Sequence, residues 1–281
     1  MIEFRVGTAS WTDPTLVNSE LFYPPSARSA EERLRFYAEQ FNTVEVDSTF
    51  YALPAERNAK LWAERTPIGF VFNIKPFALM TQHPAEISRL PKQLREMLPV
   101  KERNNRQLTR PSKEVVEMAF QMFWSAMGPL REAGKLGMVA FQFPPYFILK
   151  PANFDYLASL PERLPGASIA IEFRHPSWVR DEVRRSETMN FLRSHSLFTL
   201  RSTRPKTTRS CRRSSKLQAT RSMFAFMART ARTGSNATSP RPSGSNICIR
   251  NGSSSHFIGW DQELVLLRVL ASVVSVRLRW L

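Results

Sequence analysis

Short segments in which apolar and polar residues alternate recur along the chain, separated by segments whose apolar residues lie three or four positions apart. Alternation with a period of two is typical of a β-strand, and the wider spacing is typical of an amphipathic helix. Strands are predicted at residues 3–7, 43–47, 69–75, 136–143 and 168–178, the last of which runs out into a loop. Helices are predicted at residues 30–41, 56–65, 113–133, from Pro151 onward and at 181–194. This alternation favours a parallel sheet with helical crossovers.

The two faces of each predicted strand differ, and the difference favours a barrel over an open sheet. In the strand at 69–75, Phe72 and Ile74 share one face. Asn73 and Lys75 share the other. Both faces of a doubly wound sheet are apolar, whereas barrel strands present polar groups at the mouth formed by their carboxyl ends. We therefore predict an α/β fold, a (β/α)₈ TIM-type barrel, of which five units are recognisable.

Residues 77–112 interrupt the alternation of strands and helices. The segment contains Pro91, Pro99 and Pro111 and many charged residues, and it is too long for a simple connection. We expect an elaborated polar loop over the end of the sheet at which the strand-to-helix loops lie. The predicted organisation is a barrel region at residues 1–199 that includes this excursion, followed by an atypical segment at 200–281.

Most of the positive charge lies in that last segment. The 281 residues carry a formal net charge of +16, which by itself would indicate nucleic acid or an anionic surface as a partner. Residues 1–199 hold 25 basic and 22 acidic side chains, whereas residues 200–281 hold 15 and 2, so the body of the protein is nearly neutral. Cys211 and Cys248 also lie in the last segment, which leaves the body without a thiol nucleophile or a disulfide.

Neither end of the chain resembles a targeting or membrane segment. The first residues lead directly into a strand, and the apolar residues 264–281 are interrupted by three arginines. We expect no secretory signal and no membrane span, and hence a cytoplasmic protein.

Several motifs carry a family resemblance. In chain order they are GTASW at 7–11, FNTVEVDSTFY at 41–51, Trp62 with Pro67, FNIKP at 72–76, FQFPP at 141–145 and EFRHPSW at 172–178. Together they resemble the YecE-like family, domain of unknown function 72, over about residues 4–198. The resemblance implies a TIM-type barrel and no established reaction.

Residues 200–281 depart from this pattern. They contain an excess of Arg, Ser and Thr, few acids and no credible alternation of strands and helices. One interpretation is a basic disordered tail that binds nucleic acid. We favour a frameshift, because residues 227–255 read out of register can encode a sequence that resembles the family's remaining strands. On this hypothesis the segment does not fold natively, the barrel stays incomplete and the chain is inactive.

Two pairs of charged residues lie on the predicted lumen face near the carboxyl ends of strands. Glu172 and Arg174 are two positions apart, so both point into the lumen, where they can form an ion pair. Glu45 and Lys75 have the same parity on neighbouring strands and can form a second pair. Catalytic groups cluster at this end of a barrel. The alternative is that both pairs only stabilise the barrel.

Other polar residues lie beside these pairs. His175 follows the strand, where it is suited to general acid or base chemistry, unless a loop carbonyl before Pro176 holds its ring. Asn73 and Gln142 can orient a ligand by hydrogen bonds. The body has no Cys and no close His/Asp spacing, so we predict no metal site.

Three aromatic residues, Trp11, Tyr51 and Trp178, are placed in the loops at the same end. Aromatic rings around a charged pocket suit stacking on a sugar or a base, although simple loop packing is the slightly favoured alternative.

These residues support two hypotheses about function. The first is an enzyme that acts on a small polar or phosphorylated substrate, with Glu172, His175 or Glu45 as the acid–base groups and Arg174 and Lys75 holding an anion. The alternative is a protein that binds nucleic acid or another phosphodiester, against which the nearly neutral body argues. The sequence implies no cofactor and no membrane partner, and it leaves the reaction and the oligomeric state open.

Overall fold

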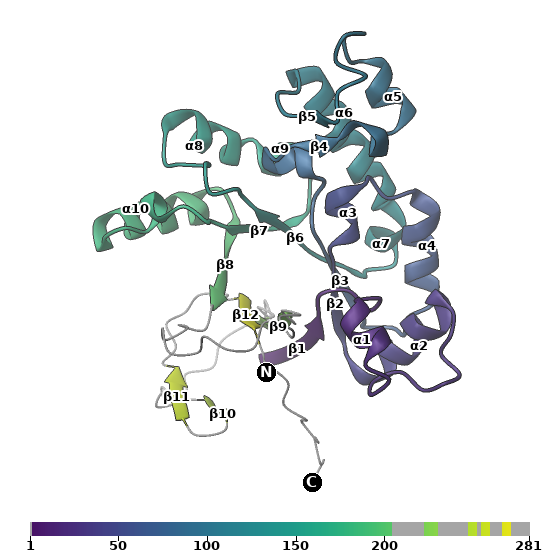
Figure 1. Ribbon diagram of the computed structural model, residues 1–281. Helices are drawn as coiled ribbons and strands as arrows, with labels where there is room; N and C mark the ends of the chain where they lie inside the picture. Colours follow the sequence, from purple (N-terminus) through teal and green to yellow (C-terminus); the bar gives the residue numbers. More distant parts are fainter. Residues whose placement is uncertain (1, 204–221, 230–246, 252–253, 259–265, 271–281) are drawn as a thin grey trace, which may run out of the picture.

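Five parallel strands form the centre of the structure, which is a computed structural model. They are β2 (Thr43–Val46), β3 (Val71–Ile74), β6 (Leu136–Gln142), β7 (Ser168–Glu172) and β8 (Leu197–Thr203). Each strand pairs in parallel with the next of the series (Figure 1). Strand order therefore follows chain order, as in a barrel, without the reversal that marks a doubly wound sheet. The predicted α/β fold with a parallel sheet is confirmed.

The first strand, β1 (Ile2–Thr8), lies beside β2, where a parallel bridge joins Ala9 to Glu45. Its other edge pairs in antiparallel fashion with β9 (Ser222–Arg229). Between β9 and β8 lies β12 (Leu266–Leu270), which is antiparallel to β9 and parallel to β8.

The structure describes the predicted atypical segment only in part. The described backbone comprises residues 2–203, 222–229, 247–251, 254–258 and 266–270, and the described side chains are those of residues 5–200. Besides β9 and β12, a hairpin of β10 (Ile247–Asn251) and β11 (Ser254–Ile258) is described. Most of residues 200–281 lie outside the described residues, so the frameshift stays a prediction. β8 crosses the predicted boundary at residue 199 and continues the parallel series beyond the fifth predicted strand.

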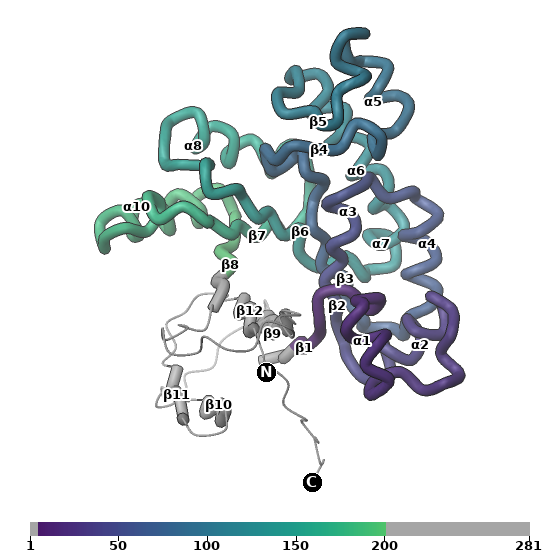
Figure 2. The backbone as a smooth tube through the Cα atoms, in the orientation of Figure 1, coloured from purple at the N-terminus to yellow at the C-terminus, as the bar shows by residue number. Residues whose placement is uncertain are grey.

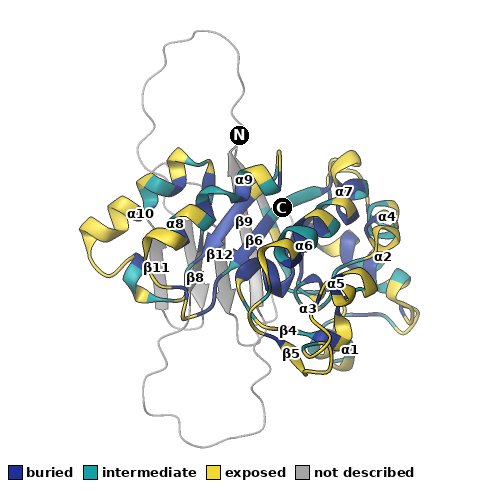
Figure 3. Cartoon of the chain, turned by 90° about the horizontal axis from the view of Figure 1, so that it is seen from above, coloured by how far each residue is buried: buried dark blue, intermediate teal, exposed yellow. Residues whose placement is uncertain are grey.

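The two faces of the sheet carry different side chains, as the alternation predicts. Phe72 and Phe141 lie on the outer face and belong to the large core shared with the helices. On the inner face, Ala170 and Leu200 form a separate small cluster against which Met138 packs. In β6, residues 139–141 are buried and the others are of intermediate exposure, and Figure 3 shows that the exposed surfaces lie mainly on the surrounding helices and loops. Alternate residues of one strand therefore point toward the helices and toward the opposite side of the sheet.

Helices alternate with the strands along the chain (Figure 2). They include α1 (Pro14–Asn18), α2 (Ala30–Gln40), α3 (Ser48–Tyr51), α4 (Glu56–Glu64), α8 (Pro151–Ala158), α9 (Leu160–Arg163) and α10 (Glu182–Ser194). The predicted bounds of α2, α4 and α10 are correct to within one residue. None of the described helices is long and apolar enough to cross a bilayer.

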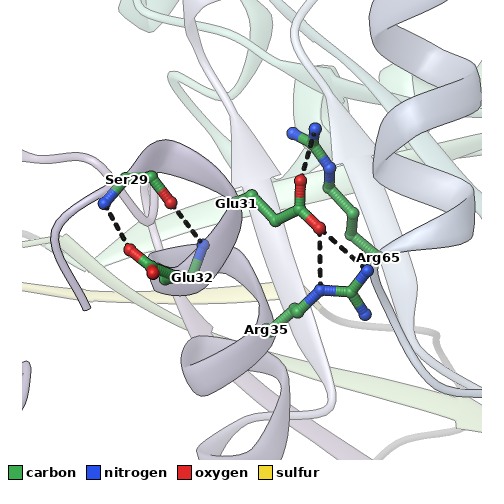
Figure 4. A network of polar contacts seen from close by, with 5 residues as sticks. All are labelled: Ser29, Glu31, Glu32, Arg35 and Arg65. Atoms are coloured by element: carbon green, nitrogen blue, oxygen red, sulfur yellow. Dashed lines mark hydrogen bonds and ion pairs between the residues drawn. The ribbon is translucent and has the colours of Figure 1, made fainter. Parts of the chain in front are cut away.

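The first turn of α2 is stabilised by a capping pattern that is evident in the sequence. Ser29 Oγ accepts the Glu32 N–H at 3.1 Å, and the Glu32 carboxylate accepts the Ser29 N–H at 2.7 Å (Figure 4). This reciprocal capping box satisfies two N–H groups that have no partner inside the helix. Next to it, the Glu31 carboxylate pairs with Arg35 on the same helix and with Arg65 at the end of α4.

The prediction of a single helix at 113–133 is wrong in one respect, because the structure divides this segment into two helices. It consists of α6 (Lys113–Ala126) and α7 (Gly128–Glu132), with Met127 between them. Pro129 causes the break, since it has no N–H to donate and its ring clashes with the preceding turn of a continuous helix.

The excursion at 77–112 is more apolar inside than its composition indicates. It contains η1 (Ala78–Thr81), a short hairpin of β4 (Ala85–Glu86) and β5 (Gln107–Leu108), η2 (Ile87–Arg89) and α5 (Lys92–Glu96). Phe77, Met80 and Leu94 are completely buried in the main core. The segment is therefore an integral part of the fold, and it lies above the carboxyl ends of β2 and β3 in Figure 1.

Tyr37 of α2 joins the first two strands. Its completely buried hydroxyl accepts the Thr8 N–H at 2.7 Å and donates to the Thr43 carbonyl at 3.1 Å. We expect Tyr37→Phe to lower the free energy of unfolding by about 1–3 kcal/mol, because the buried Thr43 carbonyl and the partly buried Thr8 N–H both lose a partner. Urea denaturation of the variant beside Tyr51→Phe, which alters an exposed ring, measures this loss, and equal midpoints would contradict it.

The same variant should change the alkaline limit of stability. Burial raises the pKa of Tyr37 to about 12, above the ordinary value of about 10. The folded state thus retains a proton that the unfolded state loses, so the free energy of unfolding should fall as pH rises from about 10 to 12. This fall should be shallower in Tyr37→Phe.

Candidate functional site

A buried ion pair lies at the carboxyl ends of β2 and β3. Lys75 Nζ is 3.2 Å from Glu45 Oε1, and the Glu45 side chain is only 1% exposed, whereas Lys75 is 15% exposed. Backbone bonds fix both partners: the Ser10 N–H donates to the Glu45 carbonyl, and the Lys75 N–H donates to the Val46 carbonyl. The structure therefore brings together the two residues that strand parity pairs. The carboxylate is enclosed, and the ammonium group is nearer to solvent.

A second charged cluster lies at the ends of β6 and β7. Gln142 and Glu172 are opposite each other in the parallel ladder, and the Gln142 amide donates to Glu172 Oε2 at 2.7 Å. Arg174 Nε lies 3.8 Å from the other carboxylate oxygen. The Glu172 side chain is 7% exposed and the Arg174 side chain 35%. The amide thus orients a buried carboxylate while the guanidinium remains accessible.

Asn73 cross-links three strands. Its amide nitrogen donates to Thr43 Oγ1 on β2 at 2.8 Å, and its Oδ1 accepts the Met138 N–H of β6 at 2.9 Å. Any side chain at Gly137 would place its Cβ 2.5 Å from this Oδ1, so the glycine permits the close approach. Both ends of the amide are engaged within the sheet, and this placement favours a structural role over the predicted role in orienting a ligand.

His175 is held by its own loop. The Ser177 N–H donates to His175 Nδ1 at 3.1 Å, so Nδ1 carries the lone pair and Nε2 carries the proton. The ring thereby caps η3 (Pro176–Trp178). This arrangement agrees with the alternative of a ring fixed by the loop, although its partner is Ser177 and not a carbonyl group.

Two of the three predicted aromatic residues lie in the core. Trp178 is completely buried, stacks on Phe173 and donates its indole N–H to the Phe147 carbonyl. Trp11 is 8% exposed and packs edge-on against Trp62. Both placements agree with the alternative of simple loop packing, because both rings are buried by neighbouring residues. Among the three, Tyr51 alone is exposed.

His83, in the excursion, lies at the same end of the sheet, and the sequence does not single it out. Its ring lies edge-on to Phe50, with 5.1 Å between the ring centroids, and the positive charge of Arg174 acts on the imidazole. Burial first, and then this charge, lowers the pKa of His83 to about 4. The sequence does contain one signal for His83. It is the single histidine of the excursion, which is expected to lie over this end of the sheet.

An open groove of about 380 Å³ adjoins the His83 loop. Its lining comprises Phe50, Tyr51, Ala78, Pro84, Ala85, Glu86, Arg89 and Gln107. The volume lies in the range of small-molecule sites, and Tyr51 supplies the exposed aromatic surface. The groove lies between the segment that follows β2 and the excursion, and its lining includes neither of the two charged pairs.

Each of the two clusters combines a cation with a buried carboxylate, and such a combination can hold an anion and exchange protons. Lys75 and Arg174 supply positive charge, and Glu45 and Glu172 supply carboxylates in surroundings of low exposure. Within the described part of the chain, no three His, Cys, Asp or Glu side chains are grouped so that they could hold a metal ion.

Comparison with known sequences gives one family. The family described as "Protein of unknown function DUF72" matches residues 5–241. This range begins in the first strand and continues beyond residue 198, where the recognisable motifs end.

Comparison with individual proteins gives relatives of the same description. UPF0759 protein YunF of Bacillus subtilis is 31% identical over 173 residues, which are 62% of this chain and 51% of that protein, so the chain spans about half the length of this relative. The solved structure of a DUF72 family protein from Thermotoga maritima is 27% identical, with a TM-score of 0.50 over 71% of this chain and 65% of that one. A DUF72 family protein from Enterococcus faecalis is 21% identical, with a TM-score of 0.52 over 72% of this chain and 62% of that one.

Proposed function

The chain belongs to the DUF72 family of proteins of unknown function, and from its site we propose an enzyme that carries out acid–base chemistry on a small anionic substrate. The observation that supports this most directly is the pairing of two buried carboxylates with two more exposed cations at the carboxyl ends of the parallel strands. In parallel α/β folds this is the end at which ligands bind.

The proposed roles follow from exposure. Arg174 and Lys75 hold the anionic group of the substrate, because their charged ends are nearer to solvent than their carboxylate partners. Glu172 exchanges a proton with the substrate, and the Gln142 amide keeps its carboxylate oriented. Glu45 holds the Lys75 ammonium group in place. A phosphate or carboxylate group is the chemical class that such a pair of cations recognises.

The first test is the binding of inorganic phosphate to the full chain. We expect Arg174→Gln to weaken phosphate binding about tenfold or more, because a charge-assisted hydrogen bond to a guanidinium contributes about 1.5–3 kcal/mol. Isothermal titration calorimetry at low salt measures the affinity.

The matched control is Arg184→Gln. Arg184 lies on α10, exposed and paired with Glu187, so this variant loses the same charge away from the site and should bind phosphate like the parent chain. Equal weakening in both variants would indicate nonspecific attraction to a basic protein and would overturn the proposed function.

A further inference from the structure

The groove next to the His83 loop has an aromatic wall, which α3 supplies. Tyr51, which is 57% exposed, and Phe50 both line the groove, with 5.2 Å between their ring centroids. Phe50 also lies edge-on to His83. Thr49 Oγ1 donates to the Lys75 carbonyl at 2.6 Å, which anchors α3 at the end of β3. The fold therefore fixes this wall, and the Tyr51 ring is its accessible part.

The polar side chains of the groove come from the hairpin of β4 and β5 and the turn that follows β4. Figures 1 and 3 show this hairpin next to α3. Glu86 and Gln107 lie directly opposite each other in the antiparallel pairing, so their side chains share one face of the hairpin. The neighbouring Leu108 is buried in the core. The hairpin thus presents Glu86 and Gln107 together, and both line the groove.

Arg89 completes the polar part of the lining. Its Nε lies 2.7 Å from Glu86 Oε2, and the two side chains are 52% and 38% exposed. The carboxylate only accepts hydrogen bonds and the guanidinium only donates them. Among the described residues that line the groove, these two are the charged ones, and their charges cancel. The groove therefore offers adjacent donors and acceptors, without net charge, near an accessible aromatic ring.

We infer that this groove is a binding site for a neutral sugar. The C–H face of a pyranose ring suits stacking on the Tyr51 ring. Each sugar hydroxyl both donates and accepts, so two neighbouring hydroxyls can bond the Glu86 carboxylate and the Arg89 guanidinium together. A groove of about 380 Å³ lies in the lower part of the range for small-molecule sites. The inference goes beyond the proposed function, because neither charged pair lines the groove.

A nucleobase is the competing ligand, since it also stacks on an aromatic ring. Two features of the lining favour the sugar. The phosphate of a nucleotide gains little from a groove in which Glu86 offsets the charge of Arg89. The donors and acceptors of a base are fixed in one plane, whereas hydroxyl groups rotate to suit a carboxylate and a guanidinium side by side. Adenosine, which carries a base and no phosphate, is therefore the comparison in the test.

The experiment is saturation-transfer difference NMR on the full chain with neutral disaccharides. Maltose, cellobiose, lactose and N,N′-diacetylchitobiose are titrated separately, beside adenosine. We expect at least one disaccharide to bind more tightly than adenosine. Saturation of the aromatic protons of the protein should pass mainly to the C–H protons on one face of a sugar ring, because that face lies against Tyr51.

Variants of the lining locate the site. Tyr51→Ala should weaken binding of the preferred disaccharide about tenfold or more, because the stacking surface is lost, while Tyr51→Phe should retain most of the affinity. Glu86→Gln should weaken binding about fivefold, since hydrogen bonds to a charged acceptor are the stronger ones. All three changes are at accessible side chains, so unfolding midpoints measured alongside should stay close to that of the parent chain.

Two matched controls lie outside the groove. Tyr146→Ala removes a ring that is 59% exposed, and Glu187→Gln removes a carboxylate that pairs with Arg184 at the same three-residue spacing as Glu86 with Arg89. Both variants should bind the disaccharide like the parent chain.

The remaining outcomes contradict the inference. If none of the four disaccharides binds, or if adenosine binds more tightly than all of them, the groove is not a sugar site. If Tyr146→Ala weakens binding as much as Tyr51→Ala, the sugar lies elsewhere. Phosphate binding is measured separately at the charged pairs, so a failure of the sugar site leaves the proposed function standing, and a failure of the phosphate test leaves the sugar site standing.

Discussion

The Gly7→Ala variant is expected to lose about 3 kcal/mol or more of its free energy of unfolding, because overpacking against rigid backbone is costly. A Cβ at Gly7 would lie 2.0 Å from the Thr43 carbonyl oxygen and 2.8 Å from its carbon, both atoms of the backbone of β2. The strands β1 and β2 would have to separate. The bond from the Ser10 N–H to the Glu45 carbonyl would then be strained, so the loss should also disturb the site. Chemical denaturation, monitored by tryptophan fluorescence, measures the loss of stability.

Two other glycines provide graded controls. A Cβ at Gly128 would meet its nearest atoms at 3.9 Å, which is ordinary contact, so Gly128→Ala should leave the midpoint nearly unchanged. A Cβ at Gly137 would lie 2.4 Å from Val71 Cγ1 and 2.5 Å from Asn73 Oδ1, which are side-chain atoms that can shift in part. The expected order of damage is Gly7, Gly137, Gly128. A Gly7→Ala variant as stable as Gly128→Ala would contradict the argument.

The strands were predictable because their pattern reflects burial on two unlike faces. Phe72 and Asn73 are neighbours in sequence, yet one enters the main core and the other turns inward to link β2 and β6. A period of two records this difference directly. The same parity places Glu45 with Lys75 on adjacent strands, so the ion pair could be predicted as well.

The roles of loop residues could not be predicted in this way, because they depend on elements distant in the sequence. Trp178 looks like a ligand-stacking residue from its position after β7, but the Phe147 carbonyl accepts its indole N–H and Phe154 packs against its ring. His83 gains its surroundings from Arg174 and Tyr146, which come from two other strand-to-helix loops. No local periodicity records such an encounter.

The excursion illustrates the same limit. Its exposed charges dominate the composition, and the buried Phe77, Leu79 and Met80 lie around a single 3₁₀ turn, which is too short to show a periodic pattern. Their burial becomes evident only when the segment packs against α6 and the strand ends.

Lys75→Met is expected to lower the free energy of unfolding by about 3 kcal/mol at neutral pH, because it removes the Lys75 ammonium group from its ion pair with the buried Glu45 carboxylate. Glu45 is 1% exposed, so water cannot replace the ammonium group. The loss should shrink as the pH falls to about 4, where a carboxyl group takes up a proton and no longer carries a charge into the interior. Denaturation at both values of pH measures the difference, and phosphate binding should weaken in the same variant.

A second substitution shows whether the buried charge causes the loss. The double variant Glu45→Gln/Lys75→Met carries no charge at this position, so it should recover part of the stability at neutral pH and lose the added pH dependence. Lys92→Met removes an exposed lysine paired with Glu96 on α5, and its midpoint should not change measurably. If Lys75→Met proves as harmless as Lys92→Met, the Glu45–Lys75 pair does not stabilise the fold. If the double variant is stable but does not bind phosphate, the pair contributes to the site as well as to the fold.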